Sequence, residues 1–142
     1  ILTVLIIIIF CYYVFSPNIS MSVANARAGI NASYPEYHPD GYSVDGALSY
    51  TDGEVTINYH SNTGDKKFSI KQSQSSWDST AVKAKVSKDS NSNFDTFQEN
   101  GLTIFSYNNN HSATWVNDSI LYSISGDAPL SREQIRHIAT SL

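Results

Sequence analysis

The side chains best suited to acid–base or metal chemistry are four histidines: His38, His60, His111 and His137. They fall in a predicted linker, strand, loop and helix, and no pair has the His-x-x-x-His spacing that places two ligands on one helix face. The single cysteine, Cys11, lies inside an apolar N-terminal run and has no second cysteine to pair with. The sequence therefore predicts no metal site and no cofactor.

Nucleophilic and phosphate chemistry lack their usual patterns as well. Serines are abundant, but no Gly-x-Ser-x-Gly elbow occurs, and serine clusters such as residues 73–76 are typical of loops and helix caps. Several aspartates lie near predicted turns, with spacings that match no calcium loop. No glycine-rich phosphate cradle is present. These absences predict a protein that is not an enzyme.

The charge balance argues against a nucleic-acid partner. Lys and Arg number 9 against 13 Asp and Glu, which gives a formal net charge of -4. Neutralising phosphates needs clustered cations. Charged residues make up 15% of the chain, below the roughly 25% of typical globular domains. Hydroxyl, amide and aromatic residues fill the shortfall, a composition typical of extracytoplasmic β-rich domains.

Four aromatic residues are the candidates for an apolar ligand-binding groove: Trp77, Tyr107, Trp115 and Tyr122. Packing in the core is the alternative for them. Trp77 is the first residue of the apolar face of a predicted helix, and Trp115 lies in the middle of a predicted strand.

The elements that must position these residues begin with residues 1–17, interpreted as a transmembrane helix. The run ILTVLIIIIFCYYVF is uncharged and covers roughly 22 Å as a helix, so we expect residues upstream of Ile1 to complete the span. The near absence of cations after it predicts a single-pass protein of the cell membrane with its C-terminal domain outside the cytoplasm. A signal peptide cleaved at residues 24–26 and a buried core element are the alternatives.

Residues 18–41 are predicted to hold a short amphipathic helix and a linker. Ile19, Val23, Ala26 and Ile30 recur at helical spacing. Two prolines and the Pro-Asp-Gly sequence at residues 39–41 then favour an extended, turning linker that enters the sheet.

Residues 42–142 are predicted to form an α+β domain with a curved antiparallel sheet of about six to seven strands and helices packed on one face. The clearest strand is 54–60, in which Val55, Ile57 and Tyr59 alternate with polar residues. Tight-turn pairs such as Asp52-Gly53 separate the strands. The other strands are predicted at 42–50, 67–73, 94–98, 102–107, 113–116 and 120–125. Large apolar groups on both faces of 102–107 predict a central strand that is covered on each side.

Two helices are predicted within this domain. The first covers about 77–87 and follows Ser75 and Ser76 as possible N-caps. The second covers 131–141, where Ser131 and Gln134 form a capping box. Its apolar stripe of Ile135, Ile138, Ala139 and Leu142 must pack on the sheet.

Several short motifs in this order resemble the bacterial domain of unknown function 4367 (DUF4367) family. They are Pro35 and Tyr37, Pro39-Asp40-Gly41-Tyr42, Trp77-Asp78, Gly101-Leu102-Thr103-Ile104, Ala113-Thr114-Trp115-Val116, and the close from Leu130-Ser131 to Ile138-Ala139-Thr140-Ser141-Leu142. The resemblance implies a half-barrel similar to periplasmic lipoprotein carriers and regulators of anti-sigma factors. Such proteins bind lipid groups or protein segments in the concave face and catalyse nothing.

The sequence thus favours a non-enzymatic, membrane-anchored extracytoplasmic binding or sensor domain. Its N-terminal helix would contact the membrane, and its ligand would be a lipid, a lipoprotein or a segment of an envelope protein. The alternative is a structural surface protein, pilin-like, in which the apolar helix assembles a fibre.

Overall fold

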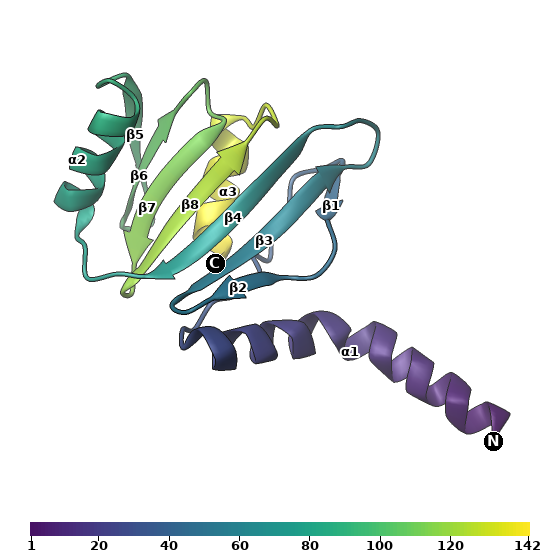
Figure 1. The fold of residues 1–142 in the computed structure, drawn as a ribbon. Helices are drawn as coiled ribbons and strands as arrows, with labels where there is room; N and C mark the ends of the chain where they lie inside the picture. The colour runs from purple at the N-terminus through teal and green to yellow at the C-terminus, as the bar shows by residue number, and fades with distance from the viewer.

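The computed structural model is organised around one antiparallel sheet (Figure 1). The structure describes residues 1–12 and 20–142, together with the helical course of the chain, but not the side chains, through residues 13–19. The strands lie in the order β1-β3-β4-β8-β7-β6-β5, and β2 also pairs with β3. Their bounds are β1 Tyr42–Val44, β2 Ser49–Thr51, β3 Glu54–Ser61, β4 Lys67–Gln74, β5 Phe94–Glu99, β6 Leu102–Tyr107, β7 Ser112–Asn117 and β8 Ile120–Gly126.

The chain contributes strands to the sheet in two groups, β1–β4 and β5–β8. β3 and β4 form a hairpin, after which helix α2 (Ser79–Asp89) carries the chain to the far edge at β5. Successive hairpins then return it, so that β8 pairs with β4 in the middle of the sheet. This confirms the predicted α+β class and antiparallel sheet. The sheet has eight strands instead of six or seven, because the strand predicted over residues 42–50 is broken at residues 45–48.

The alternation of apolar residues places the core on the expected side of β3. Val55, Ile57 and Tyr59 are buried in a single large cluster, which we call the main core. In β6, Ile104 belongs to the main core, whereas Phe105 belongs to a smaller cluster with α2, which we call the second core. Because successive residues of a strand point to opposite faces, both faces of β6 are covered, as predicted.

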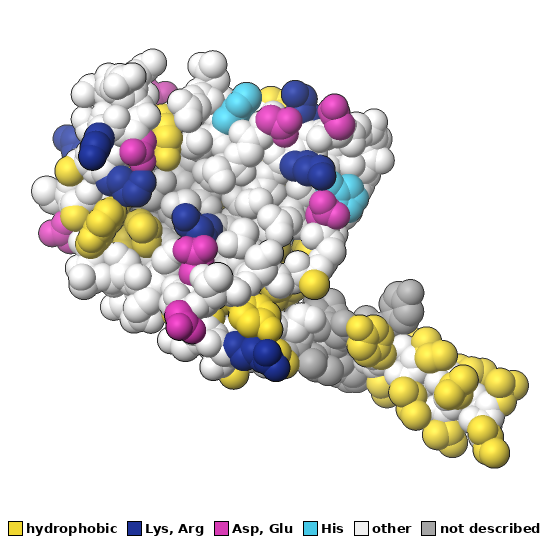
Figure 2. All heavy atoms as spheres, in the orientation of Figure 1, with side chains coloured by type: hydrophobic (Ala, Val, Ile, Leu, Met, Phe, Trp, Pro, Cys, Tyr) yellow, Lys and Arg dark blue, Asp and Glu magenta, His cyan; other side chains and the backbone are white. Residues whose placement is uncertain are grey.

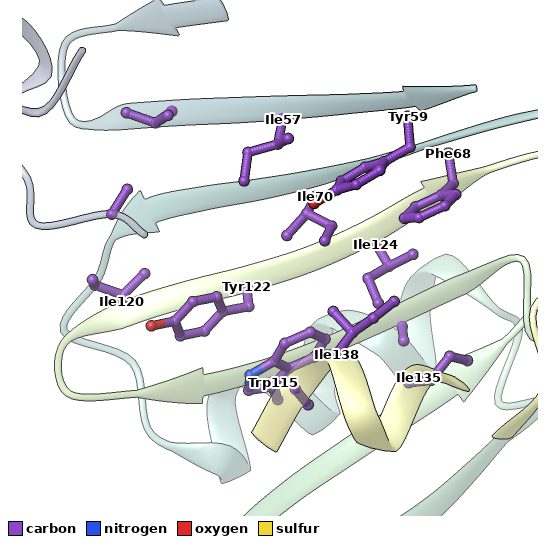
Figure 3. Close-up of a cluster of buried hydrophobic side chains, with 14 of the residues drawn as sticks. Ile57, Tyr59, Phe68, Ile70, Trp115, Ile120, Tyr122, Ile124, Ile135 and Ile138 are labelled. Carbon is purple, nitrogen blue, oxygen red and sulfur yellow. The ribbon is translucent and has the colours of Figure 1, made fainter. Parts of the chain in front are cut away.

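Helices lie on both faces of the sheet, so the expectation that they share one face is wrong. Helix α3 (Arg132–Ser141) packs Ile135 and Ile138 into the main core, while α2 packs Val82 and Val86 into the second core. The reason is the double-sided apolar pattern of β6, which requires cover on each side. Figures 1 and 3 show α3 against the main-core face.

The transmembrane helix predicted over residues 1–17 is wrong. Those residues belong to α1 (Leu2–Ala28), and among the residues that the structure describes no helix is long and apolar enough to cross a membrane. The apolar run ends halfway along α1, and polar residues follow it. The single-pass membrane localisation that depended on this span is overturned by the same finding. Figure 2 shows hydrophobic side chains exposed over the N-terminal end of α1, which projects away from the sheet.

The C-terminal part of α1 packs on the domain through a different face from the predicted one. Met21, Ala24 and Ala28 are buried in the main core. Val23 is 43% exposed and Ala26 is also exposed, although Ile30, just beyond the helix, is buried as predicted. Ile19, the first residue of the predicted face, lies outside the described side chains. The predicted boundary between residues 17 and 18 falls inside α1.

The chain between α1 and β1 packs on the main core. Ile30 and Ala32 are buried in it, and Tyr34 and Tyr37, at the start of the predicted linker, pack against it. The carboxamide of Asn25 makes two hydrogen bonds to the backbone of Ala32, at 2.8 and 2.9 Å. At the far end of the segment, Ser141 accepts hydrogen bonds from the backbone N–H groups of residues 36 and 37. Residues 30–37 are therefore held along their length across the main-core face of the sheet. We call these residues the fixed segment.

Side-chain N-caps set the first residues of α2 and α3. Ser131 and Gln134 form both hydrogen bonds of the predicted capping box at the start of α3. Helix α2 begins two residues later than predicted, because the carboxylate of Asp78, and not Ser75 or Ser76, accepts a hydrogen bond from the N–H of Ala81 at 2.9 Å. Trp77 consequently stays outside the helix.

Candidate functional site

A cavity of about 560 Å³ opens between α1 and the β1–β2 edge of the sheet. This volume is within the range of roughly 300 to 1,000 Å³ that is usual for small-molecule sites. The lining residues come from α1, the fixed segment, the broken edge strand and β3: Tyr12, Ser20, Tyr34, Pro35, His38, Ser43, Val44, Gly46, Ala47, Leu48 and Tyr59.

The outer wall of the cavity is the break between β1 and β2. At this point the N–H of Asp45 donates to the carbonyl of Asn58 at 2.6 Å, and Gly46 turns the chain with φ of 73°. Residues 45–48 leave the sheet and rejoin it at Ser49, which pairs with Thr56. Residues just before the break and within it line the cavity, so the break forms one of its walls.

Three polar side chains lie beside this wall, outside the cavity. The carboxylate of Asp45 lies 3.7 Å from Nδ1 of His60 and 3.9 Å from Nζ of Lys67. All three side chains are well exposed, so each pair contributes little to stability on its own.

Three tyrosines, Tyr12, Tyr34 and Tyr59, line the cavity. Burial raises the pKa of Tyr34 and raises that of Tyr59 further, with a smaller contribution from Tyr34 itself. Both phenols therefore keep their protons at neutral pH and can donate hydrogen bonds. The ring of Tyr59 stacks on Phe68 with centroids 4.6 Å apart, which fixes its orientation (Figure 3).

The described lining contains no Lys, Arg, Asp or Glu, and His38 is its only imidazole. Val44, Leu48 and Pro35 give it apolar surface, and Ser20 and Ser43 add neutral hydroxyls. Such a site can bury an apolar group and orient one polar end by hydrogen bonding.

Two of the four predicted groove residues lie in the main core. Trp115 is 1% exposed, and its indole stacks on the ring of Tyr122 at 5.3 Å (Figure 3). Burial, with a smaller effect of Asp118, raises the pKa of Tyr122. Neither residue lines the cavity.

The other two lie apart from this pair. Trp77 is 43% exposed in the connection between β4 and α2, and Tyr107 packs against the second core. The structure thus brings together Trp115 and Tyr122 but not the four residues as one groove. The cavity that it does form uses the break at residues 45–48, for which the adjacent pair Asp45-Gly46 is a turn signal in the sequence.

Two of the histidines have neighbours of other residue types. His60 contacts Asp45, whereas the ring of His137 lies 5.1 Å from that of Tyr37. Within the described part of the chain, no three His, Cys, Asp or Glu side chains are grouped to hold a metal ion.

One protein-family model matches the chain. Residues 33–142 match the family model described as Domain of unknown function (DUF4367). No curated protein and no solved structure matches the chain. The match begins beyond α1, at Ser33 within the fixed segment, and it covers the whole sheet and the last two helices. Because it spans most of the chain, the protein belongs to the DUF4367 family.

Proposed function

We propose that this protein is a non-enzymatic binding module whose ligand is an apolar chain with one hydrogen-bonding end, such as the acyl chain of a lipid. The observation that carries the proposal is the cavity of about 560 Å³ between α1 and the broken edge strand. Its apolar side chains would take up the chain of the ligand. The protonated hydroxyls of Tyr34 and Tyr59 would donate to its polar end.

The composition of the cavity supports binding over catalysis. The usual acid–base catalysts are carboxylates, lysines and histidines whose pKa values are tuned by their surroundings. Among the described lining residues only His38 belongs to this group, and its side chain is exposed. The ring of Tyr59, held by stacking on Phe68, gives instead a preformed apolar wall.

Isothermal titration with decanoate below its micellar concentration tests the proposal on the full chain. Ala47 is exposed and lines the cavity, so Ala47→Asp places a carboxylate in its mouth next to the carboxylate of the probe. We expect at least about a tenfold weaker affinity, because an added like charge and a lost apolar contact oppose the same ligand.

The matched control is Ala84→Asp, which adds the same charge at an exposed position of α2. This control is essential, because the N-terminal half of α1 also exposes apolar side chains that can adsorb decanoate. Equal affinities for the two variants, or no binding by the unmodified chain, would contradict the proposal. Selective binding of an apolar peptide in place of decanoate would point to a protein segment as ligand.

A second candidate function is structural self-assembly. The observation in its favour is that the apolar side chains of residues 1–10 that are large enough to drive association are more than half exposed. Under this proposal, copies of the chain associate through this part of α1. Electron microscopy and sedimentation of the unmodified chain and of Ile7→Asp test it. Ordered filaments that are lost in the variant support assembly, and a monomeric unmodified chain opposes it.

A further inference from the structure

A second, polar cleft of about 520 Å³ lies at the opposite edge of the sheet, where the α2–β5 and β6–β7 connections meet. Its lining is unlike that of the apolar cavity: Ser90, Asn93, Phe94, Asp95, Ser106, Tyr107, Asn108, Asn109 and Asn110. We propose that this cleft binds a neutral, polyhydroxylated ligand of the carbohydrate class.

The side-chain chemistry selects this class of ligand. Each sugar hydroxyl both donates and accepts a hydrogen bond, and a carboxamide offers both functions without charge. Four carboxamides line the cleft, and no Lys, Arg or His is among the described lining residues. A phosphate or other anion would meet Asp95 with no compensating cation. A hard cation needs several oxygen ligands, and the cleft has one carboxylate.

Asp95 and Ser106 form the most defined part of the cleft. They are direct partners across the β5–β6 pair, so their side chains stand next to each other on one face of the sheet. Asp95 is exposed, whereas Ser106 is only 2% exposed at the base. A carboxylate beside a hydroxyl can engage two adjacent hydroxyl groups of one sugar ring.

The walls are fixed before any ligand arrives. In one wall, the Ser90 hydroxyl donates to the Val86 carbonyl at 2.7 Å, and the N–H of Asn93 donates to the carbonyl of Ser90. In the other wall, Asn108, Asn109 and Asn110 all have left-handed backbones, with φ of 53°, 55° and 63°. Asparagine tolerates this conformation better than most residues, although glycine adopts it more easily.

Glycines would form this left-handed turn at lower cost. The three successive asparagines instead place three side-chain amides there. Among the described residues, the carboxamides of Asn93, Asn109 and Asn110 and the carboxylate of Asp95 make no hydrogen bond within the protein. Asn108 alone makes one, to the hydroxyl of Ser112 at 3.4 Å. The hydrogen-bonding capacity of the cleft is thus available to a ligand.

Saturation-transfer NMR on the full chain tests the proposal, with maltotriose, cellotriose and triacetylchitotriose at millimolar concentration as probes. We expect transfer to at least one of them, and at least about a tenfold weaker affinity for Asp95→Ala, because hydrogen bonds to a charged group are lost. Asn110→Gly removes an amide and keeps the left-handed turn, so it should weaken binding without a folding defect.

The matched control is Asn100→Gly. Asn100 also has a left-handed backbone, with φ of 49°, but it lies at the other end of the β5–β6 hairpin and does not line the cleft. Binding by this variant should equal that of the unmodified chain. Absence of transfer to all three sugars overturns the proposal. So does transfer that Asp95→Ala and Asn110→Gly leave unchanged.

Discussion

The side chain of Gln72 pairs with the backbone of Ser33 as one strand pairs with another. Nε2 of Gln72 donates to the carbonyl of Ser33 at 2.7 Å, and Oε1 accepts from its N–H at 3.0 Å. Gln72 is completely buried in β4, in the middle of the sheet. This double contact fixes the segment that forms one wall of the apolar cavity, because Tyr34 and Pro35 follow directly.

Replacing Gln72 by leucine should therefore destabilise the protein by about 2 to 4 kcal/mol. The substitution keeps an apolar stem of similar size but leaves the N–H and carbonyl of Ser33 without partners. Urea unfolding followed by circular dichroism measures the change in free energy of unfolding. Gln74→Leu, at an exposed position of the same strand, is the control and should change little. Equal effects of the two variants would refute the role of the pair.

Gly126 is required by a close approach at the end of β8. Its φ is +147°, and a Cβ at this position would lie 2.3 Å from the carbonyl oxygen of Lys67. That oxygen accepts hydrogen bonds from the N–H groups of Asp127 and Ala128, so it cannot move away freely. Gly126→Ala should cost about 3 kcal/mol or more in thermal unfolding. Gly64→Ala, which has ordinary backbone and space, should be tolerated; similar losses in both variants would contradict this account.

Asp127 should make stability depend on acid pH. The pKa of its carboxyl is lowered, chiefly because Oδ1 accepts a hydrogen bond from the N–H of Lys67 at 2.8 Å, with a smaller contribution from Lys66. A lowered pKa in the folded state favours the ionised form. Its contribution to stability is therefore present above the ordinary pKa of 3.8 and is lost as pH falls through the lowered value.

The urea midpoints of the unmodified chain and of Asp127→Asn test this dependence. We expect a constant difference above about pH 5 that shrinks progressively below it. Asp52→Asn removes a carboxylate from an exposed turn and controls for the loss of one charge. A difference between Asp127→Asn and the unmodified chain that persists unchanged at the lowest pH would disprove the assignment.

Local patterns predicted the parts of the fold that depend on neighbouring residues. Ser131 and Gln134 lie three residues apart, so their capping box is visible in the sequence, and the alternation in residues 54–60 predicted the buried side of β3. The packing face of α1 was not predictable in this way. Among its described residues, three are buried, and two of these are alanines, which carry little periodic signal beside the larger but exposed Val23.

Both candidate sites depend on contacts between distant residues. The fixed segment resembles a linker in the sequence because the partner of Ser33 is 39 residues away, and its prolines indicate only an extended chain. The polar cleft joins two connections that flank different strands. By contrast, the aromatic residues chosen from sequence include Trp115 and Tyr122, which pack on each other in the main core. Residue type alone does not distinguish a core aromatic residue from one that lines a site.

NMR shift mapping shows whether an apolar ligand binds in the cavity at the broken edge strand. Decanoate is titrated into the ¹⁵N-labelled chain while backbone amide and indole signals are followed. Binding in the cavity should give saturable shifts concentrated at Tyr34 and residues 43–48, with the indole signals of Trp77 and Trp115 unchanged. Shifts confined to residues 1–10 of α1, or centred on either tryptophan, would contradict it.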